Sequence, residues 1–341
     1  MQSLGLPELR ARRLIAQGLG GAQPHVPTGD LAATTKHMLA TQGQNYAGGL
    51  TGLALRTGLK VRHTPTVRSE LDSTMDSLGI IRTWSQRGTL HFLHEEDFWI
   101  VQLCGIRATT LNLGSVAQRW NMPEQTYREI RNAVLDAAKV QISREQVREI
   151  VDAHWGAQGS GVTSSVLRHL GAAGELVQMS KIGRHDSFIR TDQRVAQAHR
   201  RKLEDQGKEA LIRELALRYF SSRGPASVAD LAWWSGLGKT ALQKAAQSLV
   251  SSGELISFEH KGTEMYAAAW QEEVTPKQLQ AALRKRWHLP PFDEYLMAYT
   301  DRQAIFHKQA RPHEVLTANG LSWEFAVRSG MITGRSEQTA G

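Results

Sequence analysis

One order of elements recurs three times along this chain: helices followed by a hairpin of two short strands. Apolar alternation and polar turns place the hairpins at residues 79–93, 176–190 and 254–269. Helical apolar spacing precedes each hairpin. Helices followed by a hairpin form the order of a winged helix, and the architecture repeats although the sequence does not. We therefore predict an α+β fold, mainly α with small β-hairpins, built from tandem winged-helix units.

Length and element spacing predict how the chain divides. At 341 residues it has room for two or three compact units. Pro290 and Pro291 exclude a helix at that point, so we expect an irregular segment around FDEYL, followed by short strands. The predicted segments are a first winged-helix unit at 1–120, a second unit with its linking helix at 121–207, a third unit at 208–272 and a C-terminal β-rich segment at 273–341.

Charge and cysteine usage narrow the class of partner. Lys and Arg number 41 against 33 Asp and Glu, a formal charge of +8, which favours a polyanion such as duplex DNA. A basic surface that is merely solvated is the alternative. The single cysteine, Cys104, cannot form an internal disulfide or a cysteine-based zinc site, and it fits a reducing cytoplasm. The N-terminus lacks the apolar block of a signal peptide, and no run of eighteen apolar residues predicts a membrane span.

The stretch QGQNY at 42–46 is the main candidate for chemistry. Gln42 and Gln44 flank Gly43, which makes a break in a helix inexpensive. In an extended segment residues two apart share a side, so the two amides would converge there. Each amide offers an acceptor and two donors, suited to a water molecule or a base edge. The alternative is a solvated polar turn before a core helix.

Basic residues are the candidate DNA contacts. Arg12 lies on a basic N-terminal helix, Arg82 and Arg87 lie on the hairpin of the first winged-helix unit, and Lys239 and Lys244 lie on a helix of recognition type. Solvated helix faces explain such residues equally well, and a histidine on a strand is usually structural. The paired acids Asp293 and Glu294 are a weaker catalytic candidate, because such pairs usually cap a helix or face water. The full set of predicted DNA contacts is Arg12, Arg56, Arg82, Arg87, His91, Arg168, Lys239 and Lys244.

Several blocks taken together resemble the bacterial winged-helix family that contains the AlkZ-like and YcaQ-like DNA glycosylases. The resemblance covers nearly the whole chain in the family's order. It implies tandem winged-helix units in one C-shaped DNA-binding body. It also implies hydrolysis of the N-glycosidic bond of alkylated purines such as N7-alkylguanine and, in some members, of interstrand crosslinks. The blocks are LRARRL at 9–14, QGQNY at 42–46, RTWSQRGTLH at 82–91, RGPASVADLAWWSGL at 223–237 and LPPFDEYLMAYTDR at 289–302.

The resemblance assigns catalysis to Gln42 and Gln44, the glutamines of a motif in which an aliphatic residue separates them. Gly43 departs from that pattern, and Asn45 stands where an Asp is frequent. The second branch of the family has an Asp in place of the second glutamine, so Gln44 groups this chain with the AlkZ-like branch. Whether Gly43 and Asn45 weaken catalysis is left open by the sequence.

The expected chemistry suits neutral amides. N7-alkylated guanine is cationic and leaves without strong protonation, so the enzyme must position water and stabilise oxocarbenium character. The motif offers no lysine primed for Schiff-base chemistry, and Lys36, the nearest, fits a phosphate contact equally well. We therefore predict a monofunctional glycosylase without cofactor or metal, monomeric, acting on damaged duplex DNA in the cytoplasm at the nucleoid, with no membrane association.

Two other classes stay open. Winged helices are more often non-catalytic DNA-binding proteins or transcriptional regulators, and fold does not fix function. Against a regulator stands the length, because three such units exceed what one operator half-site needs. A protein that keeps the fold only to bind a partner is the third class. The Gln42 and Gln44 pair separates the enzyme from the other two.

Overall fold

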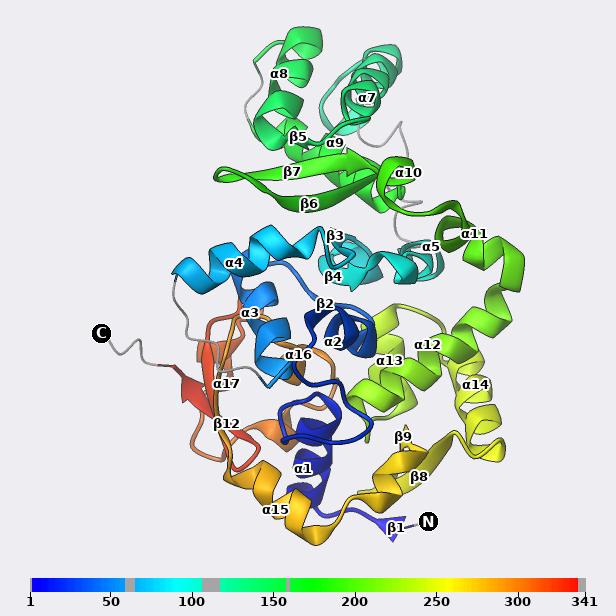
Figure 1. Cartoon of the computed structure of the whole chain (residues 1–341), viewed down its shortest axis with the longest axis vertical. Helices are drawn as coiled ribbons and strands as arrows, with labels where there is room; N and C mark the ends of the chain where they lie inside the picture. The colour runs from blue at the N-terminus through cyan, green and yellow to red at the C-terminus, as the bar shows by residue number, and fades with distance from the viewer. Residues whose placement is uncertain (1, 59–64, 106–116, 158–159, 337–341) are drawn as a thin grey trace. The chain divides into compact units, whose positions relative to one another are not determined.

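A mixture of helices and small sheets makes up the computed structural model of the chain, which describes residues 2–58, 65–105, 117–157 and 160–336 (Figure 1). The predicted α+β class is confirmed. Backbone packing divides the chain into two compact units. We call Met1–Thr64 with Glu209–Gly341 the terminal unit and Pro65–Lys208 the central unit. The predicted division into four segments stays a prediction.

The N-terminal part of the terminal unit is helical, as predicted, because each helix has a local start signal. Pro7 lies in the first turn of α1. Asp30 caps α2 by accepting from the backbone N–H of Ala33 at 3.0 Å, and Asn45 caps α3 by accepting from Gly48 at 2.8 Å. The elements are β1 (Gln2–Ser3), α1 (Leu6–Ala16), α2 (Leu31–Met38), β2 (Thr41–Gln42) and α3 (Tyr46–Arg56).

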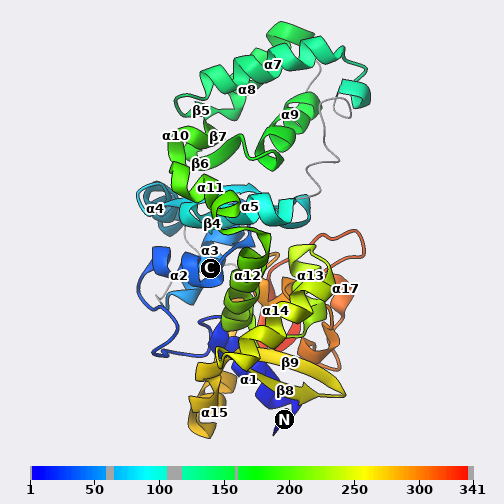
Figure 2. The same cartoon turned by 90° about the vertical axis from the view of Figure 1, so that its right-hand side faces the viewer.

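A helical trio and a hairpin follow in the terminal unit, in the order predicted from the sequence; the views in Figures 1 and 2 both place the hairpin beside the end of α14. Ser227 and Asp230 form a capping box at the start of α13. β1 adds a parallel strand to the hairpin, with Gln2 opposite Phe258. The winged-helix assignment itself stays a prediction. The elements are α12 (Lys208–Arg223), α13 (Val228–Ser235), α14 (Lys239–Ser251), β8 (Leu255–His260) and β9 (Thr263–Ala268).

The C-terminal part forms an antiparallel sheet in the order β10-β11-β12. Its core includes α1, because Leu14 and Ile15 of that helix pack in one cluster with Tyr295 and Phe325. The irregular segment expected around FDEYL contains a short helix instead, which Asp293 caps by accepting from Tyr295 N at 2.8 Å. The elements are η4 (Ala269–Glu273), α15 (Pro276–Arg284), β10 (Arg286–Leu289), α16 (Glu294–Met297), η5 (Gln303–Ile305), α17 (Pro312–Val315), β11 (Phe325–Arg328) and β12 (Met331–Arg335).

The central unit joins two of the predicted hairpins in one sheet, in the order β4-β3-β6-β7-β5. Arg82 on β3 pairs with Gln178 on β6, so the hairpins at 79–93 and 176–190 lie side by side. The elements are α4 (Pro65–Met75), β3 (Ile80–Trp84), η1 (Gln86–Gly88), β4 (Leu90–His94), η2 (Glu95–Asp97), α5 (Trp99–Cys104), α7 (Glu124–Ala137), β5 (Ile142–Ser143), α8 (Arg144–Trp155), α9 (Ser160–Ala172), β6 (Leu176–Ile182), β7 (His185–Arg190), α10 (Thr191–Arg194) and α11 (Gln197–Gln206).

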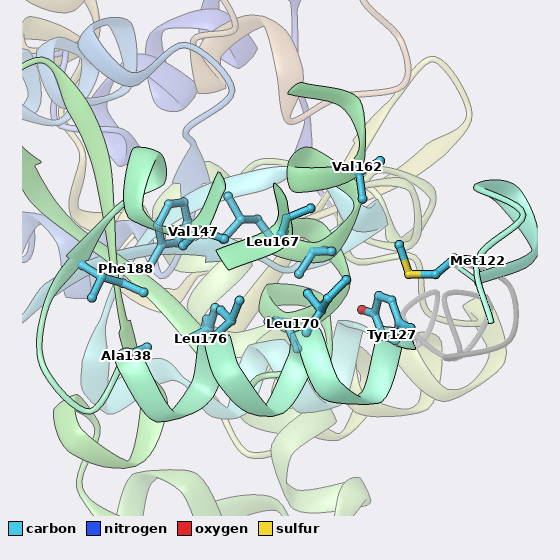
Figure 3. Packing of buried hydrophobic residues seen from close by; sticks show 14 of the residues in the cluster. Met122, Tyr127, Ala138, Val147, Val162, Leu167, Leu170, Leu176 and Phe188 are labelled. Atoms are coloured by element: carbon cyan, nitrogen blue, oxygen red, sulfur yellow. The ribbon is translucent and has the colours of Figure 1, made fainter. Parts of the chain in front are cut away.

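Three helices, α7, α8 and α9, pack with β6 and β7 to form a hydrophobic core (Figure 3). Tyr127 of α7, Val147 of α8 and Leu167 of α9 are all fully buried, together with Phe188 of β7. A capping box starts α8: Ser143 Oγ accepts from the backbone N–H of Gln146 at 3.2 Å, and the Gln146 side chain accepts from the backbone N–H of Ser143 at 2.8 Å.

Candidate active site

The glutamine motif lies on a non-helical segment between α2 and α3, as Gly43 predicts. β2 ends at Gln42, and α3 begins at Tyr46. The two glutamines differ in environment, because Gln42 is only 6% exposed whereas Gln44 is exposed. Gln44 therefore lies at the surface, whereas Gln42 belongs to the packed interior. That the two amides converge stays a prediction.

A sharp turn leads into the motif. Leu39, the C-cap residue of α2, has a φ of 63°, a backbone angle that residues other than glycine rarely adopt. Arg223, at the end of α12, donates from Nη1 to the carbonyl of Met38 at 2.9 Å and from Nη2 to that of Ala40 at 2.6 Å. One buried guanidinium thus satisfies two carbonyls of the turn, which compensates for its strained backbone.

The same guanidinium holds a carboxylate that binds the motif. Arg223 donates from Nε at 2.9 Å and from Nη2 at 2.7 Å to Glu294 Oε2, and Trp234 Nε1 donates to the same oxygen at 3.1 Å. The other oxygen, Glu294 Oε1, accepts from the backbone N–H of Gln42 at 3.0 Å. Arg223 is fully buried and Glu294 is 1% exposed, so this ion pair is well shielded from water. We call Arg223, Trp234 and Glu294 the clamp.

A second buried ion pair lies beside the clamp. Arg56, the last residue of α3, donates to both oxygens of Asp293, at 2.8 and 2.7 Å, and to Gln17 Oε1 at 2.7 Å. Burial lowers the pKa of Arg56, but the attraction of Asp293 outweighs that effect and raises the pKa above its ordinary value. The guanidinium is therefore permanently charged and bound to its partner.

A small cavity lies between β2, α3 and residues 291–294. Its volume is about 10 Å³, comparable to that of one water molecule and far below that of a purine. Glycine at position 52 lets α3 lie close to Asp293 on the other side of this cavity. A Cβ at Gly52 would come within 3.1 Å of Asp293 Oδ2. The lining residues are Thr41, Gln42, Gly48, Gly49, Gly52, Arg56 and 291–294.

Four of the predicted DNA contacts are buried and bound to protein groups. Arg56 belongs to the ion pair with Asp293 described above. Arg12 is 5% exposed and donates to Glu8 and to a backbone carbonyl of η4. Arg82 is 4% exposed and bound to Gln178. These arginines face the protein interior rather than a surface that a phosphate reaches.

His91, the fourth buried candidate, lies on β4 with none of its surface exposed. Its Nδ1 is 3.0 Å from both Ser85 Oγ and the carbonyl of Thr89. The structural role that is usual for a histidine on a strand therefore accounts for it, and its burial gives no support to a DNA contact.

The other predicted contacts lie at or near the surface. Lys239, Lys244 and Arg168 are exposed, on α14 and α9, and Lys244 pairs with Glu209 at 2.6 Å. Arg87 is half-buried at the turn between β3 and β4, with a φ of 58°. Lys239 and Lys244 also line a groove of about 740 Å³ between α13, α14 and β9.

Sequence reasoning missed the clamp as a functional group. In the sequence, Arg223 and Trp234 stand out only within a block that carries the family resemblance, and Glu294 only as part of an acidic pair. Glu294 lies 252 positions after Gln42 in the chain, so no spacing rule connects them. The one available signal was the presence of two adjacent acids in a segment that is otherwise apolar.

Neither a metal-binding cluster nor a membrane-spanning helix occurs within the described ranges. His, Cys, Asp and Glu side chains there form no group of three or more that could hold a metal ion. Across the same ranges, no helix is both long and apolar enough to cross a bilayer.

Comparison with known proteins gives one family and one solved structure. Residues 35–340 match the family described as DNA glycosylase AlkZ-like, and no curated protein matches the sequence. The structure of the Streptomyces sahachiroi DNA glycosylase AlkZ is similar, with a TM-score of 0.73 at 20% identity, covering 99% of this chain and 89% of that one. At this identity the likeness establishes the fold alone.

Proposed function

Since the chain belongs to the AlkZ-like DNA glycosylase family, we propose that it is a monofunctional glycosylase that hydrolyses the N-glycosidic bond of alkylated purines, such as N7-alkylguanine, in damaged duplex DNA. The observation that carries the proposal is the glutamine motif, where a buried Gln42, whose backbone N–H is bound by Glu294, precedes an exposed Gln44. Interstrand crosslinks that join alkylated purines are included as substrates, because they present the same kind of N-glycosidic bond.

The chemistry follows from charge. The alkylated base is already cationic, so the bond from C1′ to the base breaks with its electron pair going to the base. The sugar then carries oxocarbenium character, which the carbonyl dipole of Gln44 stabilises from the solvent side. A water molecule that the motif orients forms the new bond to C1′ and loses its proton to bulk water. Water is the only co-reactant, so no cofactor enters.

Substitution of Gln44 tests this proposal. Gln44→Ala should slow the single-turnover release of N7-methylguanine from duplex DNA by about a hundredfold, since removing one transition-state group commonly costs that much. Because Gln44 is exposed, the variant should keep its melting temperature and its affinity for duplex DNA. Gln206→Ala, at an exposed position on α11, is the matched control.

Gln42→Ala should slow the reaction as well, but less, if Gln44 faces the sugar and Gln42 supports the water. An unaltered rate in the double Gln42→Ala, Gln44→Ala variant would show that the motif is only a polar turn.

We propose that the enzyme works as a monomer, in the cytoplasm at the nucleoid.

A further inference from the structure

We propose that Glu294, held by Arg223, is a positioning residue for hydrolysis of the N-glycosidic bond. It fixes the backbone of the glutamine motif. The proposal rests on the function proposed above, because it assumes that Gln42 and Gln44 carry the reaction. Glu294 acts through Gln42 rather than on the substrate, since the clamp is buried beneath the motif.

The bonds of Glu294 show how it acts. Its Oε2 accepts three N–H groups, two from Arg223 and one from Trp234, so that oxygen is committed to the clamp. Its Oε1 accepts from Gln42 N. With both oxygens bound, the carboxylate is poorly placed to take up a proton from water. Its effect on the reaction is therefore geometric.

The segment that the clamp holds needs such support. From Met38 to Gln42 the chain contains a non-glycine residue at positive φ and a strand of only two residues. Arg223 binds two carbonyls of this segment and Glu294 binds the N–H that follows them. The clamp thus fixes the turn at both ends. A shift of this segment by 1 Å would misplace the amides, and misplacement of that size costs up to about a hundredfold in rate.

The isosteric variant Glu294→Gln separates positioning from packing. Its amide can turn either its oxygen or its NH₂ toward the clamp. Three donors, two of them on a guanidinium, require an oxygen there, so the NH₂ must face the backbone N–H of Gln42. The contact to Gln42 is lost while the shape of the side chain is kept.

We expect Glu294→Gln to slow single-turnover release of N7-methylguanine by about tenfold to a hundredfold, with duplex affinity within about twofold of the native protein. Hydrogen exchange, followed by mass spectrometry, should show faster exchange in the peptide that contains residue 42. Rates are to be measured at least ten degrees below the melting temperature of each variant. Should Glu294→Gln fail to fold, Glu294→Asp keeps the charge opposite Arg223 and shortens the reach to Gln42.

Asp230→Asn is the matched control. Asp230 is also a buried carboxylate with several protein partners, accepting from Thr300 N at 2.7 Å and from Ser227 N at 2.9 Å, but it belongs to the α13 cap and not to the clamp. It should lower the melting temperature without changing the rate of release. Equal rate losses in Asp230→Asn and Glu294→Gln would mean that both act through general stability, and would overturn the proposal.

The outcomes also separate this proposal from the proposed function. If the native protein releases no base, the proposed function fails, and the exchange measurement alone decides whether Glu294 holds the motif. If the native protein is active, a Glu294→Gln protein that keeps its rate and its exchange pattern overturns the positioning role and leaves the proposed function intact.

Discussion

His37 of α2 illustrates how a single half-buried side chain sets a pH dependence near the motif. Its Nε2 lies 2.7 Å from the carbonyl of Ala16. Burial lowers its pKa to about 4, the bond to Ala16 opposes that effect, and the charges of Arg223 and Arg218 add to it. In the unfolded chain the pKa returns to about 6.5. The unfolded state therefore takes up the proton first as the pH falls.

From this difference we predict a loss of stability between pH 6.5 and 4. At pH 5 His37 should cost the folded state about 2 kcal/mol relative to pH 7.5. The variant His37→Gln can still donate to the carbonyl of Ala16 but does not titrate. The melting temperature of the native protein minus that of His37→Gln should therefore fall as the pH is lowered. A constant difference between the two proteins from pH 7.5 to pH 5 would contradict the prediction.

For single residues, the sequence predicts a contiguous motif better than it predicts which side chains are buried. Gln42 and Gln44 are recognisable because the motif is contiguous. Burial is a different matter, since the partners of Arg56 and Arg223 lie 237 and 71 positions away. A positive charge in the sequence is equally compatible with a phosphate contact and with a buried ion pair, and only the packed chain distinguishes them.

Elements were more predictable than residues, because their boundaries depend on local chemistry. The capping box at Ser143 and the cap at Asp30 lie within three residues of the N–H groups that they bind. The short helix α16 was missed because Pro290 and Pro291 govern only their immediate neighbours, and Asp293 starts a new turn just after them. Caps that follow prolines are easily overlooked for this reason.

One helix, α14, is expected to contact DNA through an exposed face. Lys239→Gln should weaken binding to all duplex sequences alike and reduce the salt dependence by about one counterion, if Lys239 meets a phosphate. Fluorescence anisotropy at several salt concentrations measures both effects. The comparison variant is Arg82→Gln on β3, where the side chain is buried, so it should lower the melting temperature instead. A loss confined to certain sequences would indicate base reading by Lys239.

For the whole molecule, the net charge of +8 predicts binding that depends strongly on salt. Affinity for undamaged duplex should fall at least about tenfold between roughly 50 and 200 mM salt, because each phosphate contact releases a counterion. Damage should be preferred over any particular sequence. Enrichment of one clear motif from random duplexes would instead support a transcriptional regulator. An absence of binding even at low salt would contradict every DNA-directed function.

The order of residues along the chain does not indicate which segments form the terminal unit. Residues before 65 and after 208 form it together, and α1 shares a core with the C-terminal sheet. Predictions of consecutive segments follow the chain, whereas this unit joins its two ends. The clamp shows the same arrangement, since it binds an early segment through late residues.

That arrangement also sets when the site comes into existence during protein synthesis. A ribosome makes Gln42 long before Glu294, and at about 5 to 20 residues per second the interval between them is roughly ten to fifty seconds. During that time the glutamines have been made but the carboxylate that fixes them has not. A nascent chain that stalls before residue 294 therefore carries the motif without its support, and the complete site belongs only to a chain that has been translated past Glu294.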